Sequence, residues 1–273
     1  GSSTHCLNSH FVVKDKVIVN IGGTAGIGLA AAQAFVASGA KVVALGNRPE
    51  DEKTASKLLG DQGKVLTSDA TQTGSADLAI QTAVETFGTL DGLYHVAGGS
   101  GRKFGDGTLA EVSKEGWEKT LELNLTSVML SNQAAIQWFI KHKKAGAILN
   151  LGSVLGTNPS PKYFGTIAYA TAKAGLIGMS KAAAAYHSAD NIRVNVLAPG
   201  LVDSPMSRRA SDNEEIQYFI KSKQALDGGR NGGTDDLVGA ALYFLSDSSK
   251  FTTGQVLNVC GGWEFNDGQI LMQ

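Results

Sequence analysis

Three side chains that suit proton transfer lie in the same region of the chain: Ser153, Tyr169 and Lys173. Tyr169 and Lys173 are four residues apart, a spacing that places both on one face of a helix. The pKa of a free tyrosine is about 10, too high for acid-base work at neutral pH, and a nearby ammonium favours the phenolate. We therefore expect Lys173 to lower the pKa of Tyr169. About 0.4 Tyr-x3-Lys pairs are expected by chance in a chain of this composition. The pair therefore indicates a catalytic site only in combination with the other motifs of the chain.

A glycine-rich turn runs from Gly22 to Gly28 and leads from a strand candidate into a helix candidate. Glycines let a backbone approach a pyrophosphate closely, and the first turn of a helix offers free N–H groups and a partial positive charge. The spacing is Gly-x3-Gly-x-Gly, which differs from the commonest dinucleotide fingerprint, Gly-x-Gly-x-x-Gly. No Gly-Lys-Ser/Thr is present, which disfavours nucleoside triphosphate hydrolysis. The alternative is a tight strand-to-helix turn without a ligand.

Two further strand ends carry side chains suited to the adenosine half of a dinucleotide. The second strand candidate is followed by Asn47 and Arg48, with no carboxylate for a ribose 2′-hydroxyl, and an arginine pairs with a 2′-phosphate. NADP(H) is therefore weakly favoured over NAD(H), with a solvated Arg48 as the alternative. Asp69 and Ala70 follow the third strand candidate. The Asp69 carboxylate either accepts from the adenine amino group or caps the next helix.

Short β-branched runs alternate with longer helical patterns along the chain. The strand candidates are Val17 to Ile21, Lys41 to Leu45, Lys64 to Ser68, Gly92 to His95, Ala147 to Leu151, Arg193 to Ala198 and Val256 to Val259. The helix candidates are Gly26 to Ser38, Glu50 to Gln62, Ser75 to Phe87, Trp117 to His142, Ala168 to Ser188, Glu214 to Leu226 and Thr234 to Ser246. This alternation predicts an α/β fold, a Rossmann-type doubly wound parallel sheet of about seven strands with helices on both faces. Ligands bind such sheets beyond the carboxyl ends of the strands.

Composition excludes several classes of protein. The 273 residues carry 24 Lys+Arg and 25 Asp+Glu, a formal net charge of −1, without a block of like charges, which argues against nucleic acid and polybasic membrane binding. No uncharged apolar run reaches the roughly 18 residues of a membrane span, and no secretory signal is present, so we expect a cytoplasmic protein. The two cysteines, Cys6 and Cys260, are interpreted as free thiols. The five histidines show no ligand spacing, so no metal site is predicted.

The chain is interpreted as one domain with a short extension. Residues 1–12 form the N-terminal extension, whose Gly1-Ser2-Ser3 start is typical of a cloning remnant. Residues 13–273 are predicted to form a single Rossmann-type domain, in which residues 202–233 make the substrate loop. The nucleophile elbow of a hydrolase, Gly-x-Ser-x-Gly, would need glycines at the positions of Leu151 and Leu155 around Ser153. Asn124-Leu125-Thr126 matches an N-glycosylation pattern, but no secretory signal precedes it.

Together these motifs resemble the short-chain dehydrogenase/reductase (SDR) family, from Val17 to Gly262. The residues that carry the resemblance are Gly22, Gly26, Gly28, Asp69, Ala97-Gly98, Asn124, Ser153, Tyr169, Lys173, Pro199-Gly200 and Gly261-Gly262. The resemblance implies that Tyr169 is the general acid/base, that Ser153 holds the substrate oxygen, and that Lys173 binds the nicotinamide ribose and lowers the tyrosine pKa. It implies that Asn124 anchors a water in a proton relay. The residues implied for the cofactor are Gly22, Thr24, Gly26, Ile27, Gly28, Asn47, Arg48, Asp69, Ala70, Ala97, Gly98, Lys173, Pro199, Gly200 and Val202.

The chain departs from the family pattern at several positions. Ile21 stands where threonine is usual, His95 where asparagine is usual, and Cys260 where aspartate is usual. We interpret His95 as a hydrogen-bonded histidine at a strand end. Ser153 and Tyr169 are 16 positions apart, somewhat more than is common. The added residues include an aromatic pair, Tyr163 and Phe164, which either walls an apolar pocket or packs the loop.

We therefore expect an oxidoreductase that moves a hydride between NAD(P) and a small carbonyl or secondary alcohol substrate, with Tyr169 transferring the proton. Within the family the alternative is a 3-oxoacyl-thioester reductase acting on acyl-carrier-protein substrates. Basic loops slightly favour this alternative, although solvated charges are the simpler interpretation: Arg102, Lys103, Arg208 and Arg209.

Two hypotheses lie outside the family. The first is a non-catalytic NAD(P)-sensing regulator, which would need none of the polar residues Asn124, Ser153, Tyr169 and Lys173. The second is a methyltransferase, which would need a carboxylate after the second strand candidate. The resemblance also implies a homodimer or homotetramer, with residues 117–142 and 168–188 as packing surfaces.

Overall fold

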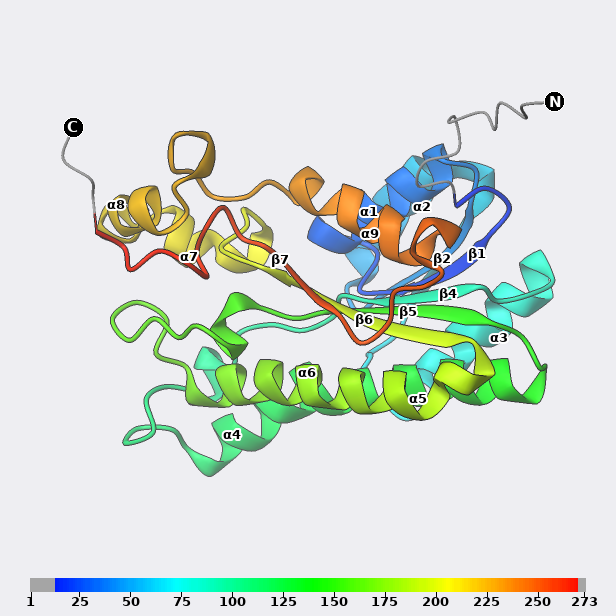
Figure 1. Ribbon diagram of the computed structural model, residues 1–273, viewed down its shortest axis with the longest axis horizontal. Helices are drawn as coiled ribbons and strands as arrows, with labels where there is room; N and C mark the ends of the chain where they lie inside the picture. The colour runs from blue at the N-terminus through cyan, green and yellow to red at the C-terminus, as the bar shows by residue number, and fades with distance from the viewer. Residues whose placement is uncertain (1–12, 270–273) are drawn as a thin grey trace, which may run out of the picture.

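Seven strands form one parallel sheet in the computed structural model, which describes residues 13–269 (Figure 1). In space they lie in the order β3-β2-β1-β4-β5-β6-β7. Their bounds are β1 (Val17–Ile21), β2 (Lys41–Gly46), β3 (Gly63–Thr67), β4 (Gly92–His95), β5 (Gly146–Leu151), β6 (Ile192–Pro199) and β7 (Val256–Val259). The predicted doubly wound Rossmann-type sheet is thereby confirmed. The extension expected over residues 1–12, including Cys6, lies outside the described residues.

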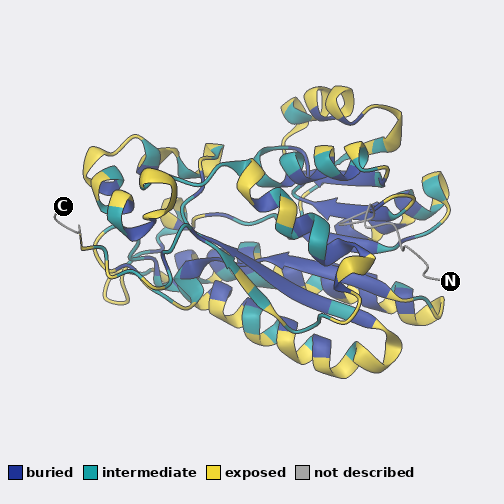
Figure 2. Cartoon of the chain, turned by 45° about the horizontal axis from the view of Figure 1, so that its top comes forward, coloured by how far each residue is buried: buried dark blue, intermediate teal, exposed yellow. Residues whose placement is uncertain are grey.

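The central strands are apolar because both faces of the sheet are covered. Every residue of β1 is buried, and successive side chains point to opposite faces. Ile18 packs in the core on one face, whereas Val17 and Val19 pack in the core on the other. Figure 2 shows the same division, with dark blue strands between helices that turn their exposed surfaces outward. The order of the strands reverses between β1 and β4, which opens a crevice at their carboxyl ends.

Helices cover both faces of the sheet. Their bounds are α1 (Gly26–Ala37), α2 (Pro49–Leu59), α3 (Ser75–Phe87), α4 (Lys114–Leu121), α5 (Ser127–Lys141), α6 (Ile167–His187), α7 (Arg208–Ser211), α8 (Glu214–Lys223) and α9 (Val238–Leu245). Helices α1 and α9 pack together on one face, and α3 and α5 on the other, where α6 also contacts β6 (Figure 1). No helix within residues 13–269 is long and apolar enough to cross a bilayer.

The single helix predicted over residues 117–142 is wrong. The chain forms α4, then a π-helical segment over Glu122–Thr126, then α5. The backbone N–H of Ser127 donates to the carbonyl of Glu122, five residues back, so the turn holds one extra residue. Helix α4 also begins earlier than expected, because the side chain of Ser113 accepts from the N–H of Gly116 and caps it.

Other predicted boundaries differ by a few residues for local reasons. The helix expected to run to Gln62 ends at Leu59, because Gly60 adopts a φ of +61°, and a short 3-10 turn follows. The helix expected from Thr234 opens as a 3-10 turn, and α9 proper begins at Val238. Helix α8 ends at Lys223, three residues before the expected end.

His95 ends β4 and is 1% exposed. Its Nε2 lies 3.1 Å from the carbonyl oxygen of Ala97, which only accepts, so Nε2 carries the proton and donates it. Its Nδ1 lies 2.7 Å from the hydroxyl of Ser131 and accepts from it. Burial, assisted by the charge of Lys173, lowers the pKa of His95 to about 3. The interpretation of His95 as a hydrogen-bonded strand-end histidine agrees with this geometry.

The buried His95 predicts a loss of stability in acid. Its imidazole stays neutral in the folded chain down to about pH 3, whereas a histidine in the unfolded chain takes up a proton near pH 6.5. The free energy of unfolding therefore falls as the pH drops through this window. We expect His95→Asn to lower the proton uptake on unfolding by up to about one proton between these pH values. Urea unfolding at a series of pH values measures this proton uptake as the slope of the free energy of unfolding against pH. The same slope in the wild type and in His95→Asn would contradict the lowered pKa of His95.

Candidate active site

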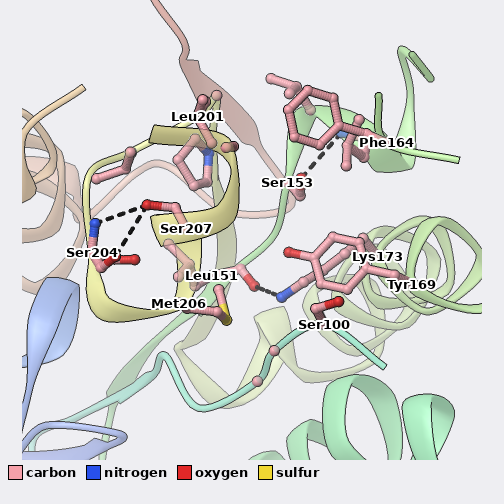
Figure 3. Close-up of a pocket in the computed structure, with 18 of the residues that line it drawn as sticks. Ser100, Leu151, Ser153, Phe164, Tyr169, Lys173, Leu201, Ser204, Met206 and Ser207 are labelled. Carbon is pink, nitrogen blue, oxygen red and sulfur yellow. Dashed lines mark hydrogen bonds between the residues drawn. The ribbon is translucent and has the colours of Figure 1, made fainter. Parts of the chain in front are cut away.

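A pocket of about 170 Å³ opens at the carboxyl ends of the strands (Figure 3). Segments after β1, β4, β5 and β6 contribute to it, together with the start of α6 and Trp263 after β7. Its lining includes these residues predicted for the site: Ile27, Gly98, Ser153, Tyr169, Lys173, Pro199, Gly200 and Val202. This is the position where a ligand is expected in a doubly wound sheet.

Ser153, Tyr169 and Lys173 converge in this pocket. Ser153 begins the turn after β5, where its hydroxyl accepts from the N–H of Leu155 at 3.1 Å. Tyr169 and Lys173 lie on one face of α6, as the spacing predicts, with the Lys173 ammonium 5.6 Å from the centroid of the tyrosine ring. The same ammonium donates to the carbonyl of Leu151 at 2.9 Å, the bond drawn in Figure 3.

The pKa of Tyr169 does not move in the predicted direction. Burial of the phenol raises it to about 12, although the residue is partly exposed, and a hydrogen bond with Ser153 opposes the rise. Lys173 is 3% exposed, and burial lowers its pKa to about 8. The predicted fall of the tyrosine pKa below its ordinary value is therefore wrong for this structure, because burial of the phenol is the largest cause of the shift. At neutral pH Tyr169 carries its proton.

Asn124 lies inside the π-helical segment and is fully buried. Its amide donates to the carbonyl of Gly99 at 2.8 Å and to that of Thr120 at 3.0 Å, and its oxygen accepts from the N–H of Gly99 at 2.8 Å. A Cβ built on Gly98 would lie 2.7 Å from this oxygen and 3.6 Å from the Lys173 ammonium. Asn124 therefore holds the backbone segment after β4 beside Lys173.

The glycine-rich turn is tightly packed against neighbouring backbone. A Cβ on Gly22, whose φ is +85°, would lie 2.5 Å from the backbone nitrogen of Ala97, and one on Gly28 would lie 1.8 Å from the carbonyl oxygen of Gly22. Close packing is therefore a sufficient reason for glycine at Gly22 and Gly28, without a bound ligand. Gly26 differs, since its φ is +52° but the nearest atoms to a Cβ are 3.9 Å away.

The start of α1 fits a dinucleotide pyrophosphate. Ala25 occupies the N-cap position and no side chain caps the helix, so the N–H groups of its first turn have no side-chain acceptor. Glycine at this turn permits the close approach that an anion needs. Both properties suit a nicotinamide dinucleotide, for which residues 22–28 would hold the pyrophosphate. Thr24 packs its side chain against Gly46 at the end of β2 and is 7% exposed.

The residues predicted for the adenosine half lie outside the pocket lining, after β2 and β3. Arg48 is exposed, and its Nε lies 3.0 Å from a carboxylate oxygen of Glu50 and 3.4 Å from one of Asp51. Asp69 is also exposed and accepts at 2.9 Å from the N–H of Thr71.

Asp69 therefore caps a turn. It does not cap the next helix, because α3 has Gly74 at its N-cap, and the proposed helix cap is wrong. Asn47 is exposed and Ala70 partly buried beside these two residues.

Asp106 is a residue that sequence patterns did not identify. It is 6% exposed, and its carboxylate accepts from the backbone N–H of Ala168 at 2.9 Å and from that of Tyr169 at 3.0 Å. A carboxylate at the first turn of a helix binds free N–H groups and complements the helix dipole. The loop after β4 therefore sets where α6 begins. The only hint in the sequence is an acid within a glycine-rich segment.

Trp263, in the wall of the pocket, is a second residue that sequence patterns did not identify. Trp263 is 1% exposed and packs edge-on against Phe164 with ring centroids 5.7 Å apart. Leu155 and Met206 also line the pocket. Phe164 was predicted either to wall a pocket or to pack its loop, and it does both. Cys260 is a free, buried thiol behind this wall.

Loss of the Asp106 carboxylate is expected to destabilise the fold. Asp106→Ala leaves two buried N–H groups unpaired and should lower the free energy of unfolding by about 2 kcal/mol, with a smaller loss for Asp106→Asn, which keeps one acceptor. Urea unfolding measures the difference. The matched control is Glu111→Ala, an exposed carboxylate in the same loop, with an expected change within about 0.5 kcal/mol. Equal effects of the Asp106 and Glu111 variants would contradict the role given to Asp106.

The sequence matches characterised reductases over most of its length. A sequence profile described as enoyl-(acyl carrier protein) reductase matches residues 22–264. The 3-oxoacyl-(acyl-carrier-protein) reductase FabG of Salmonella typhimurium is 34% identical over 247 residues, covering 90% of this chain and 96% of that protein. The reductase of the same name from Chlamydia muridarum is 34% identical over 260 residues, covering 94% of this chain and 99% of that protein.

The fold also matches solved structures. A short-chain type dehydrogenase/reductase from Mycobacterium ulcerans aligns with a TM-score of 0.83 and 27% identity, covering 93% of this chain and 92% of the other. A short-chain type dehydrogenase/reductase from Mycobacterium marinum aligns with a TM-score of 0.84 at 24% identity, covering 94% of this chain and 98% of the other, a likeness of fold. The chain therefore belongs to the short-chain dehydrogenase/reductase family and is an NAD(P)-dependent oxidoreductase that acts on a carbonyl or secondary alcohol group.

Proposed function

We propose that this oxidoreductase works as a carbonyl reductase in which Tyr169 donates the proton. The observation that carries the proposal is the convergence of Ser153, Tyr169 and Lys173 in one pocket at the carboxyl ends of the strands. Burial keeps the Tyr169 phenol protonated at neutral pH, and the protonated form is the one that reduction requires. Oxidation of an alcohol would need the phenolate, which the raised pKa disfavours.

Each of the three side chains has a separate task in this proposal. The hydroxyls of Ser153 and Tyr169 donate hydrogen bonds to the substrate oxygen, and Tyr169 delivers its proton to that oxygen as negative charge develops there. A bound nicotinamide supplies the hydride. The Lys173 ammonium, with a pKa of about 8, lies beside the tyrosine ring and stabilises the phenolate left behind.

Backbone segments complete the site. Asn124 fixes the segment at Gly98 and Gly99, and Asp106 fixes the first turn of α6, so both act by positioning. The cofactor would be held by residues 22–28 and 97–98 together with Pro199, Gly200 and Val202. Residues 202–233 would form the substrate loop of a single domain over residues 13–273.

A 3-oxoacyl thioester is the second candidate substrate. Two observations favour it: the similarity to 3-oxoacyl-(acyl-carrier-protein) reductases and the apolar wall of the pocket. An acyl chain packs against apolar side chains, and the 3-oxo group would lie near Tyr169. The first candidate, a small free carbonyl compound, differs in needing no carrier.

We also propose NADP(H) as the cofactor. The loop after β2 offers Arg48 and no carboxylate at Asn47, and a guanidinium pairs well with a 2′-phosphate. Glu50 and Asp51 hold Arg48 in this structure, so the phosphate would compete with two exposed carboxylates. This competition makes a modest preference for NADP(H) the expected result.

The proposal includes a cytoplasmic location and assembly into a homodimer or homotetramer. Large apolar side chains are exposed on α5, where Met129 is 39% and Ile140 46% exposed. Residues of this kind gather where helices of two subunits pack. Family resemblance supports the same surfaces.

Replacing Tyr169 by Phe should abolish most turnover. Loss of a general acid lowers kcat by about 10²- to 10⁴-fold, and the phenylalanine ring preserves packing. Steady-state reduction of a panel of ketones with NADPH measures the loss, and fluorescence titration checks that cofactor binding persists. The matched control is Tyr186→Phe, an 81% exposed tyrosine of the same helix, with unchanged turnover. Wild-type turnover in Tyr169→Phe would exclude Tyr169 as the acid, whereas cofactor binding without turnover in the wild type would support a cofactor-binding regulator.

Two variants around Arg48 should shift NADPH affinity in opposite directions. Arg48→Ala removes the phosphate contact and should weaken NADPH binding about tenfold without changing NADH binding. Glu50→Gln releases the guanidinium from one competitor and should tighten NADPH binding. Fluorescence titration with both cofactors measures these changes. NADH preference in the wild type that neither variant alters would make Arg48 a solvated loop charge.

A further inference from the structure

Two arginines from distant segments meet at the rim of the active-site pocket. Arg102 lies in the short turn Arg102–Phe104 after β4, and Arg209 lies in α7. Both donate to the carbonyl oxygen of Tyr163, at 3.2 Å from Arg102 and 2.9 Å from Arg209. Tyr163 belongs to the lengthened segment between Ser153 and Tyr169. The chain therefore brings two like charges to one carbonyl oxygen of the segment that leads to Tyr169.

Neither arginine has an anionic partner. Within residues 13–269 neither forms an ion pair, and none of the described residues that line the pocket is an acid. Glu215, which accepts from the hydroxyl of Tyr163, pairs with Lys162. A guanidinium has five N–H donors, and each of these two uses one in a side-chain hydrogen bond to the described protein.

The arrangement disfavours the charge of Arg209. Burial and the neighbouring Arg102 lower the pKa of Arg209. A single guanidinium would suffice to hold the Tyr163 carbonyl, so the second adds repulsion with little structural gain. An oxyanion placed between two guanidiniums relieves that repulsion and forms charge-assisted hydrogen bonds with both.

The surroundings limit what such an anion is attached to. The Arg209 guanidinium lies 5.6 Å from the centroid of the Phe164 ring, which packs on Trp263. Arg102, Arg209, Phe164 and Trp263 line the same pocket as Ser153 and Tyr169. A molecule that fills it has a reacting oxygen at Tyr169, an apolar body against the aromatic rings and a charged end at the rim.

We propose that the substrate carries an oxyanion, a carboxylate or a phosphate, which Arg102 and Arg209 bind together at the rim of the pocket. This inference rests on the proposed reductase function and adds the chemical class of the substrate. A free oxo acid supplies a carboxylate, whereas a pantetheine-type thioester supplies a phosphate. The shared requirement is a negative charge separated from the carbonyl by an apolar segment.

Kinetics with charged and neutral substrates test the pair. The substrates are a short 3-oxo acid, its methyl ester and the phosphopantetheine thioester of the same acyl group, each with saturating NADPH. We expect Arg102→Gln and Arg209→Gln each to lower kcat/KM for the preferred anionic substrate about tenfold, and the double variant more, with ester reduction unchanged within about twofold. The anionic substrate whose reduction is slowed, the 3-oxo acid or the phosphopantetheine thioester, shows whether the arginines bind a carboxylate or a phosphate. Lys103→Gln and Arg208→Gln are the matched controls, since these neighbouring cations do not line the pocket.

The neutral ester separates binding of an anion from support of the loop. If the arginines only hold the Tyr163 carbonyl, the variants lower reduction of ester and anion equally, and this result overturns the inference. Unchanged kinetics for all three substrates in the double variant overturns it as well. In both cases reduction by the wild type leaves the proposed reductase function intact.

A binding measurement keeps the inference testable without turnover. The probe is a short 3-hydroxy acid, whose affinity is measured by quenching of tryptophan fluorescence, because Trp263 lies in the pocket wall. We expect the Arg102→Gln/Arg209→Gln variant to bind the acid at least about tenfold more weakly than the wild type. If no carbonyl is reduced but this difference persists, the proposed reductase function fails and the anion site stands. Equal binding by both proteins overturns the anion site.

Discussion

The start of helix α6 is the constraint on which the site depends. Tyr169 and Lys173 reach the pocket because α6 begins at Ile167, and one turn more or less would carry both away from Ser153. The Asp106 carboxylate fixes this start from the loop after β4, and the N–H of Ile167 donates to the carbonyl of Gly107 in the same loop at 2.8 Å. Helix α6 is thus tied to the sheet through the segment after β4, which also packs against the glycine-rich turn.

Burial, more than pairing of charges, determines the protonation states in this site. The pKa of Tyr169 is raised, while those of Lys173 and His95 are lowered, and burial is the largest cause in each case. All three shifts favour the neutral form, as expected where water is excluded. A neutral phenol is ready to donate a proton, and a lysine with a pKa of about 8 changes charge at little cost near neutral pH.

Local patterns in the sequence were sufficient for the elements that depend on neighbouring residues. All seven strands were located within two residues, because buried parallel strands are short continuous apolar runs. The Tyr169–Lys173 spacing likewise predicted their common face of α6.

Features that depend on distant residues were not predictable. The bond from Ala168 to Asp106 joins residues 62 positions apart, and the indole of Trp263 donates to the carbonyl of Asn158 across 105 positions. The shift of the Tyr169 pKa was predicted with the wrong sign because helical spacing reveals a neighbouring charge but not how much water remains.

Positive charge is concentrated in the lining of the pocket. The whole chain has a net charge of −1, yet the charged residues that line the described pocket are Arg102, Lys173 and Arg209, all cations. Positive charge concentrated in an apolar cleft attracts anions more strongly than the same charge spread over the surface. The uncapped start of α1 adds its partial positive charge on the cofactor side. An anionic cofactor would then be attracted by the start of α1 and an anionic substrate by Arg102 and Arg209, which line the same pocket as Tyr169.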